Sequence, residues 1–416
     1  MFSASRLIRP GLVLAFTLSF LSYPAGLSQV VQIAPVLILL ALALASLWSP
    51  AGVAALRAAL MPENAVLLVV VTALAVLVSV TGLEPAGSLL QAGLLTMVLW
   101  SAFIIVRVAG LPAVLRAFGW AGVICTGITL AYFASQPALV IGALQGVRPP
   151  MPLGFHPNTL GFLLVGFALG QPWFERQTRW RFAISVGTAL SAFALINIVS
   201  SRASLAGLLG GALVLAALRS GASARAILRP WVIIAAGLLG TLGWTLATAE
   251  ATQERAASIA AAAVDLLQLN NEGRGVGTGL SGRGQIWESL GAELGHGAWV
   301  AGVGYRVTAD SIAIDNSYLV LAYEMGIVPT VLIVGKFLLL LALAAIAYAR
   351  APASARGLYG VIVALIVAHL INNYAARYLI AVGNPFSLMM LFILVMPASA
   401  LGALPQRHAK MQAIIT

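Results

Sequence analysis

The chain has 416 residues, of which 61% are hydrophobic and 8% are charged. In soluble domains about a quarter of the residues are charged. The composition therefore excludes a soluble globular protein and predicts an integral membrane protein. The net charge of +11 is explained by arginines distributed about a membrane, without any need for nucleic-acid binding.

Apolar segments of roughly 17 to 25 residues, long enough to cross a bilayer, recur along the chain. Arg6 and Arg9 precede the first of them, and others follow at once, so we interpret it as an uncleaved helix and not as a secretory signal. The expected spans are 10–27, 30–47, 64–81, 88–106, 114–134, 157–174, 182–199, 203–219, 230–249, 327–349, 358–376 and 383–402. The sequence thus predicts an all-α polytopic membrane protein with about twelve transmembrane helices.

Basic residues are divided unequally between the two ends of these spans. With a cytoplasmic N-terminus, fifteen lie on the inner side, seven lie on the outer side, and Lys336 falls within a span. The outer seven are Arg148, Arg202, Arg255, Arg274, Arg283, Arg306 and Arg377. Because cytoplasmic loops carry the excess of Lys and Arg, we expect both termini to be cytoplasmic.

The apolar pattern stops over residues 250–326, which hold nine of the twelve carboxylates. A segment this polar cannot lie in hydrocarbon, so we expect a large external loop with short helices, periplasmic if the cell has two membranes. Residues 1–249 then form an N-terminal transmembrane bundle of about nine spans, and residues 327–416 form the C-terminal transmembrane helices and a cytoplasmic tail.

The few histidines and the single cysteine argue against a metal site or a disulfide. Cys125 lies in an apolar segment, and the four histidines are scattered without the spacing of metal ligands. No Walker motif is present, so we expect neither a metal nor a cofactor, and the energy for a reaction must come with the substrate.

Outer-side arginines are candidate ligands for a phosphate ester, because guanidinium stays charged and offers paired donors to phosphate oxygens. Arg202 lies in a tight turn between two spans, and Arg283 lies near Trp287. The alternative for Arg202 is that it only anchors a helix end among the lipid headgroups. Further candidates are Arg148, Arg274 and Arg306.

Three other groups of polar residues have two interpretations each. Asp315 begins a predicted amphipathic helix over 315–325, where it either deprotonates or orients a sugar hydroxyl or caps the helix. His156 and Asn158 flank a proline at the start of a span and either bind sugar hydroxyls or satisfy a helix N-terminus. His369, with Asn372 and Asn373, lies in a span, where both a functional role and packing hydrogen bonds are open.

Several motifs follow one another on the predicted outer face. They are Gly154-Phe-His-Pro-Asn158, Ser201-Arg202, Ser281-Gly-Arg283-Gly-Gln-Ile-Trp287, Gly302-Val-Gly304-Tyr305, Asp315-Asn-Ser-Tyr-Leu and Glu324-Met-Gly326. Together they resemble the O-antigen ligase and polymerase family, which includes exopolysaccharide polymerases. The motifs cover about residues 150 to 335, and the expected number of spans agrees with the family over the whole chain.

The resemblance implies a metal-independent, inverting glycosyltransferase that acts on undecaprenyl-diphosphate-linked glycans at the outer leaflet of a bacterial inner membrane. It implies that Arg202 and Arg283 bind the diphosphate and that Asp315 takes the place of a histidine found in the ligases. Pro329, where the ligases have a small residue, favours the polymerase branch. The remaining candidates for substrate binding are Trp287, Asn316, Tyr318 and Glu324.

We therefore predict an enzyme that polymerises lipid-linked repeats into a surface polysaccharide or exopolysaccharide. Its expected partners are the donor and acceptor glycans, the bilayer, a flippase and a chain-length regulator, and nucleic acid is not expected. A ligase that transfers the glycan to lipid A-core or another acceptor is the alternative enzyme. A secondary transporter is the alternative of another class, although such proteins have paired halves and ionisable groups in mid-membrane, where Lys336 is the one clear candidate.

Overall fold

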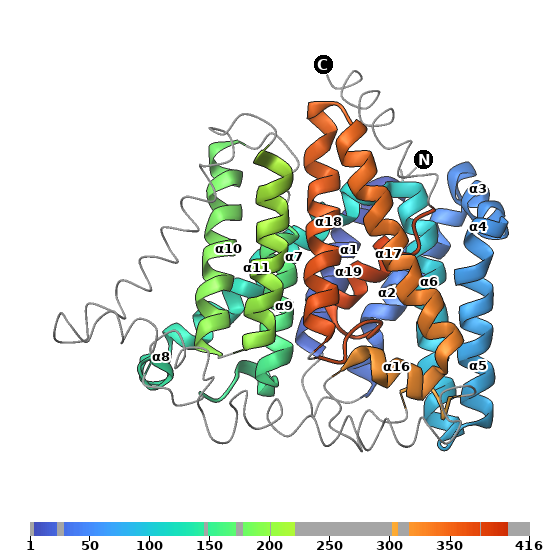
Figure 1. Cartoon of the computed structure of the whole chain (residues 1–416), viewed down its shortest axis with the longest axis horizontal. Helices are drawn as coiled ribbons and strands as arrows, with labels where there is room; N and C mark the ends of the chain where they lie inside the picture. Colours follow the sequence, from blue (N-terminus) through green and yellow to red (C-terminus); the bar gives the residue numbers. More distant parts are fainter. Residues whose placement is uncertain are drawn as a thin grey trace.

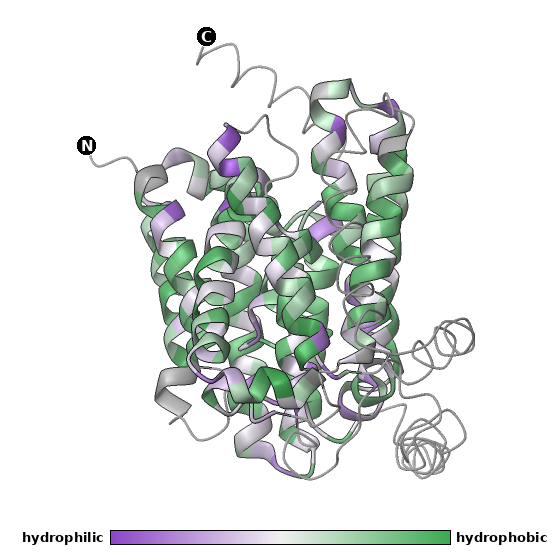
Figure 2. Cartoon of the chain, turned by 90° about the vertical axis from the view of Figure 1, so that its left-hand side faces the viewer, coloured by the Kyte–Doolittle hydropathy of each residue, from purple (hydrophilic) through white to green (hydrophobic). Residues whose placement is uncertain are grey.

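A bundle of helices makes up the part of the chain that the computed structural model describes, namely residues 4–22, 29–144, 149–171, 178–199, 201–220, 302–306, 316–374 and 376–397. No strand occurs among these residues. Most helices run roughly along one direction and are hydrophobic along their length, with hydrophilic residues mainly near the two ends of the bundle (Figures 1 and 2). The prediction of an all-α membrane protein is confirmed at this level.

The N-terminal half supplies most of the long helices. They are α1 (Ala4–Ser22), α2 (Gln29–Leu47), α3 (Pro50–Ala59), α4 (Pro62–Ala65), the π-helix η1 (Val66–Val71), α5 (Thr72–Thr81), α6 (Pro85–Ala109), α7 (Leu111–Ala134), α8 (Pro137–Leu144), the short 3-10 helix η2 (Pro152–Gly154), α9 (Pro157–Leu169), α10 (Arg179–Ile198) and α11 (Arg202–Ser220). The C-terminal part supplies α16 (Ser317–Met325), α17 (Ile327–Arg350), α18 (Ala353–Asn373) and α19 (Pro385–Leu394).

Six described helices are long and apolar enough to cross a membrane, or seven if the bent pair α2 and α3 forms one span. The described residues therefore contain fewer membrane-spanning helices than the predicted number of about twelve. Two expected spans are helices of 13 and 10 residues, because Gly170 ends α9 and because α19 is confined between Pro385 and Pro397. The expected span 230–249 lies outside the described residues, as does most of the expected external loop.

The two ends of the bundle differ in their basic residues. We call them the α3 end and the α16 end, after the helices that lie there (Figure 1). Near the α3 end, the first two turns or the last turn of the helices carry Arg6, Arg9, Arg57, Arg107, Arg116, Arg179, Arg181, Arg219, Arg350 and Arg356. Near the α16 end, the described residues include Arg202, Arg306 and Arg377. The division agrees with the sides assigned to these residues from the sequence.

Small residues let the central helices approach one another closely, as is common between membrane helices. A Cβ on Gly207 of α11 would lie 1.8 Å from the side-chain amide of Asn372 in α18, and one on Gly211 would lie 2.9 Å from Ala364 O. On α9, a Cβ on Gly161 would lie 2.6 Å from Ser204 Oγ. These glycines hold α9, α11 and α18 together without space for a larger residue.

Candidate functional site

The α16 end gathers those predicted site residues that the structure describes. Arg202 is the first residue of α11, and Asn316 precedes α16. His156 and Asn158 lie at the start of α9, and Arg306, Tyr318 and Glu324 lie in and beside α16. The other predicted residues, Arg148, Arg274, Arg283, Trp287 and Asp315, lie outside the described residues.

Asn316 and not Asp315 is the N-cap of α16. Its Oδ1 accepts hydrogen bonds from Tyr318 N at 3.0 Å and Leu319 N at 3.2 Å. The helix consequently begins at Ser317, later than the predicted start at 315, and the capping role considered for Asp315 belongs to its neighbour. A side chain that caps a helix is fixed in position, so Asn316 contributes to the site through the orientation of α16.

The segment 302–306 is fixed against the C-terminal end of α16 by its backbone. Val303 N donates to Tyr323 O and Gly304 N donates to Glu324 O, each at 3.0 Å, while Val303 O accepts from Leu83 N at 2.8 Å. Gly302 and Gly304 have positive φ of 72° and 122°, a conformation open to glycine at little cost. The Gly-Val-Gly motif therefore brings Tyr305 and Arg306 beside Glu324.

Residues 376–384 form a loop between α18 and α19 that returns toward α16. The Ser317 hydroxyl can donate to Asn373 Oδ1 at 2.5 Å or to Ala376 O at 2.7 Å, and it accepts from Leu379 N at 3.3 Å. Asn373 Oδ1 also accepts from Tyr378 N at 2.9 Å. These bonds fix the backbone on both sides of Arg377.

Two further bonds tie the same loop to helix α18 and to the segment 302–306. His369 Nε2 lies 3.0 Å from Leu379 O, and the Tyr305 hydroxyl donates to Ile380 O at 3.1 Å. Asn373 Nδ2 donates to His369 O at 2.8 Å. The buried polar groups His369 and Asn373 thus hold the loop, which is the packing role considered for them from the sequence.

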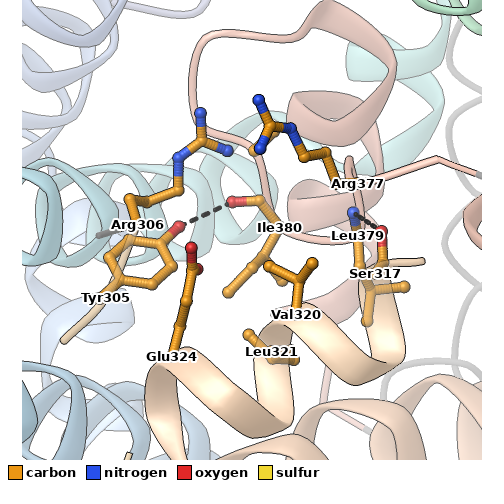
Figure 3. Close-up of a pocket in the computed structure, with 10 residues that line it drawn as sticks. Tyr305, Arg306, Ser317, Val320, Leu321, Glu324, Arg377, Leu379 and Ile380 are labelled. Atoms are coloured by element: carbon orange, nitrogen blue, oxygen red, sulfur yellow. Dashed lines mark hydrogen bonds between the residues drawn. The ribbon is translucent and has the colours of Figure 1, made fainter. Parts of the chain in front are cut away.

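A pocket opens between α16, the segment 302–306 and the loop 376–384 (Figure 3). Its walls combine five polar or charged side chains with apolar ones. The lining residues are Tyr305, Arg306, Ser317, Val320, Leu321, Glu324, Arg377, Leu379, Ile380 and Ala381. In Figure 3 the guanidinium groups of Arg306 and Arg377 lie on the side away from α16, and the Glu324 carboxyl group points toward that side from α16.

The pocket is electrostatically mixed. Glu324 is only 2% exposed, whereas Arg306 and Arg377 are partly exposed. Burial raises the pKa of the Tyr305 phenol; the nearby Arg306 acts to lower it, and Glu324 acts to raise it. Burial also raises the pKa of Tyr318 to about 12, and its hydroxyl donates to Leu370 O at 2.7 Å. Both tyrosines are therefore neutral hydrogen-bond donors at physiological pH.

His156 and Asn158 form a separate polar group at the start of α9. His156 Nδ1 accepts a hydrogen bond from Asn158 N at 3.3 Å, and the Ser201 hydroxyl donates to Asn158 Oδ1 at 3.4 Å. His156 is exposed. The N-terminal capping considered for this pair is confirmed, and the bond to Ser201 links it to the residue before Arg202.

The sequence missed three polar residues of the pocket, namely Tyr305, Ser317 and Arg377. Tyr305 and Ser317 lie inside the quoted motifs, next to residues that were chosen. Arg377 was counted among the outer-side cations, but it lies in no motif, and its 71-residue separation from Arg306 hides their proximity. In the described residues, no group of three His, Cys, Asp or Glu is placed to hold a metal ion.

Comparisons with known protein families and with curated proteins find no match for this chain.

Proposed function

We propose that this membrane protein is an inverting glycosyltransferase that polymerises undecaprenyl-diphosphate-linked oligosaccharide repeats. The observation that carries the proposal is the pocket at the α16 end, where Arg306 and Glu324, both selected from the sequence, line one cavity beside Asn316 and Tyr318. It lies at the same end of the bundle as Arg202 (Figure 1). Residues from three of the quoted motifs therefore meet beside one pocket.

The proposed orientation follows from the basic residues. The α3 end carries most of the described arginines, and cytoplasmic segments of membrane proteins carry the excess of positive charge. The α3 end would then face the cytoplasm and the α16 end would face the periplasm of a bacterial inner membrane. We further propose that the whole chain has about twelve spans, with residues 250–326 as an external loop over the α16 end.

In the proposed reaction, a hydroxyl of the acceptor glycan attacks the anomeric carbon of the donor from the face opposite the lipid diphosphate. The bond from that carbon to the diphosphate breaks, the new glycosidic bond forms, and the anomeric configuration inverts. Asp315 takes the hydroxyl proton or orients the hydroxyl. Arg202 and Arg283 bind the departing diphosphate, whose charge grows during the reaction, and fixed guanidinium groups stabilise that charge.

The remaining candidates bind or position the two glycans. Because no nucleoside triphosphate is used, the lipid diphosphate itself provides the driving force. Fixed arginines take the place that a metal ion has in many diphosphate-dependent transferases. Sugar hydroxyls would be held by His156, Asn158, Trp287, Asn316, Tyr318 and Glu324, and further phosphate contacts would come from Arg148 and Arg274.

The decisive experiment incubates the purified, full-length protein with one defined undecaprenyl-diphosphate oligosaccharide in the presence of a metal chelator. Mass analysis should show a ladder of products that differ by whole repeats. A single transfer to an added lipid A-core acceptor, without a ladder, would identify a ligase instead. If neither product forms while the protein stays folded, the glycosyltransferase proposal is wrong.

A further inference from the structure

Two tryptophans near the α3 end of the bundle are largely exposed. Trp48, just before α3, is 94% exposed, and Trp180, the second residue of α10, is 81% exposed. The two helices lie on opposite sides of the bundle (Figure 1). Tryptophan is enriched where a membrane meets water, because its ring suits the acyl chains and its N–H suits the headgroups. The two side chains therefore indicate that the headgroup layer of one leaflet lies at the α3 end.

Helix α3 runs across the bundle at this end. The angle between α2 and α3 is 111°, so α3 is roughly perpendicular to α2. After α3 the chain enters the apolar helical segment Pro62–Thr81, which is long enough to cross a membrane. A helix that joins two apolar segments of this kind and lies across them runs roughly parallel to the membrane surface.

Hydrogen bonds fix both ends of α3. At its start, Ser49 N and Oγ donate to Ser46 O at 3.0 and 2.7 Å, and Gly52 N donates to Ser49 Oγ at 3.1 Å. At its end, Asn64 Nδ2 donates to Ala58 O at 2.8 Å. A Cβ on Gly52 would lie 2.0 Å from Ser46 O, so glycine permits the close approach at the bend. The protein itself therefore holds α3 in this orientation.

The two faces of α3 differ in the size of their side chains. The helix packs against α2 and α6, and its buried face consists of the small residues Gly52, Ala55 and Ala59. The exposed face consists of large apolar residues at helical spacing, namely Val53, Leu56 and Leu60. Arg57 is exposed among them. An apolar stripe that includes a basic residue, on a helix parallel to the surface, is typical of helices that lie in the membrane interface.

The α3 end as a whole carries a positive charge. Among the described residues, ten arginines lie there, and Glu63 at the start of α4 is the one carboxylate. Contacts of individual side chains within the protein leave this sum of formal charges unchanged. Because a positive surface attracts anionic phospholipids, the charge of this end favours lipid of that class around α3.

We propose that α3 lies in the headgroup layer of the membrane and binds anionic phospholipids through Arg57. The apolar stripe lies among the first carbons of the acyl chains, and the alkyl part of Arg57 lies along it. The guanidinium group then donates paired hydrogen bonds to a lipid phosphate. This inference goes beyond the proposed function, because it involves neither the pocket nor the glycan.

The test compares the lipids around two leucines of similar exposure at opposite ends of the bundle. Leu60, at the end of α3, is 68% exposed, and Leu83, at the α16 end, is 72% exposed. Leu60→Cys and Leu83→Cys variants of the full-length protein each receive one fluorophore, while the buried Cys125 stays unlabelled. Nanodiscs contain equal amounts of phosphatidylglycerol and phosphatidylcholine, and the chains of one lipid or the other carry bromine atoms that quench fluorescence.

At residue 60, brominated phosphatidylglycerol should quench the fluorophore more strongly than brominated phosphatidylcholine does. Arg57→Gln should lower this preference by about fivefold, which corresponds to about 1 kcal/mol for one basic residue at a membrane surface. Arg57→Lys should keep most of the preference, since it keeps the charge. At residue 83, the two lipids should quench equally, and Arg57→Gln should change nothing.

Other results would overturn the proposal. Equal quenching by the two lipids at residue 60, with Arg57 intact, would show that α3 does not select anionic lipid, and this comparison requires no change of Arg57. An unchanged preference in Arg57→Gln would show that Arg57 does not bind the lipid. Quenching by aqueous iodide without quenching by either lipid would place α3 in water. Protection from both iodide and lipid would show that protein, such as a second copy of this chain, covers α3.

Discussion

The hydroxyl oxygen of Ser317 lies 2.5 Å from the side-chain amide oxygen of Asn373. This contact joins the first residue of α16 to the last residue of α18. Both side chains also bond to the backbone of the loop that carries Arg377. One buried polar contact therefore connects two helices and sets the shape of the pocket.

Ser317→Ala should destabilise the protein by about 1–3 kcal/mol, because it removes the hydroxyl that bonds the backbone N–H of Leu379 and the backbone carbonyl of Ala376. Thermal unfolding in detergent provides the measurement. The control is Ser135→Ala, which removes an exposed hydroxyl that bonds Tyr132 O at 2.7 Å and should change stability by less than about 0.5 kcal/mol. Equal effects of the two substitutions would contradict the role given to Ser317.

Gly302→Ala should be far more harmful than Gly154→Ala, although both glycines have nearly the same φ, 72° and 75°. Each substitution should cost about 1 kcal/mol of stability, because alanine must adopt the left-handed conformation. At Gly302 the new Cβ would also lie 2.7 Å from Glu324 O, whereas at Gly154 it meets nothing within 4 Å. Unfolding temperatures should show the difference. A Gly302→Ala protein as stable as Gly154→Ala would mean that the 302–306 segment is not held as described.

Gly207→Ala should separate α11 from α18, because its Cβ would overlap the Asn372 amide at 1.8 Å. Overpacking of this kind costs roughly 1–3 kcal/mol. Gly187→Ala on α10 is the matched substitution in an open position, with nothing within 4 Å, and it should be neutral or slightly stabilising because alanine favours helix by up to about 1 kcal/mol. Comparing the yield of folded, monodisperse protein and its unfolding temperature checks both expectations.

Arg202→Ala should abolish polymer formation while the protein remains folded in the membrane, if Arg202 binds the lipid diphosphate. Arg219→Ala is a control on the same helix, since Arg219 lies at the opposite end of α11. The ladder assay on the two purified variants provides the measurement. Polymer of normal yield and length from Arg202→Ala would remove this residue from the diphosphate site.

The raised pKa of Tyr318 predicts that the protein loses stability at alkaline pH. Burial raises its pKa from 10.0 to about 12, so the folded protein favours the neutral phenol. Its contribution is complete below pH 10 and is lost as the pH rises from 10 toward 12. Tyr318→Phe should lower stability at neutral pH, because the bond to Leu370 O is lost, and should weaken the alkaline decline. Parallel stability curves for the two proteins above pH 10 would contradict this assignment.

Apolar runs and turn residues predicted where the helices lie, but not how long each would be. Runs such as 327–349 and 88–106 coincide closely with α17 and α6, because nothing within them interrupts helical hydrogen bonding. The expected spans 157–174 and 383–402 were too long, since local capping at Gly170 and Val395 ends α9 and α19 early. Capping depends on the conformation of a single residue, and the average hydrophobicity of a segment carries no information about that conformation.

The pocket was predictable only where its residues lie close together in the sequence. Glu324 lines the pocket from α16, and Asn316 and Tyr318 lie beside the pocket at the start of the same helix, so a motif could place them together. Asn316 and Asp315 both suit an N-cap, and the sequence did not distinguish which of them caps α16. Arg377 lines the pocket because long-range hydrogen bonds hold its loop, such as the bond that Ile380 accepts from Tyr305, 75 residues earlier. No local pattern encodes such a pairing.

The sharp bend of 111° between α2 and α3 turns the chain across the direction of α2. Ser49 caps α3 just after the bend, and the neighbouring Trp48 is 94% exposed. Because α3 runs across the bundle, spin labels placed along it would report nearly constant immersion depth. Labels placed along α2 would instead report depths that change by about 1.5 Å per residue. A single series of paramagnetic-quencher measurements would therefore locate the membrane–water boundary on the protein.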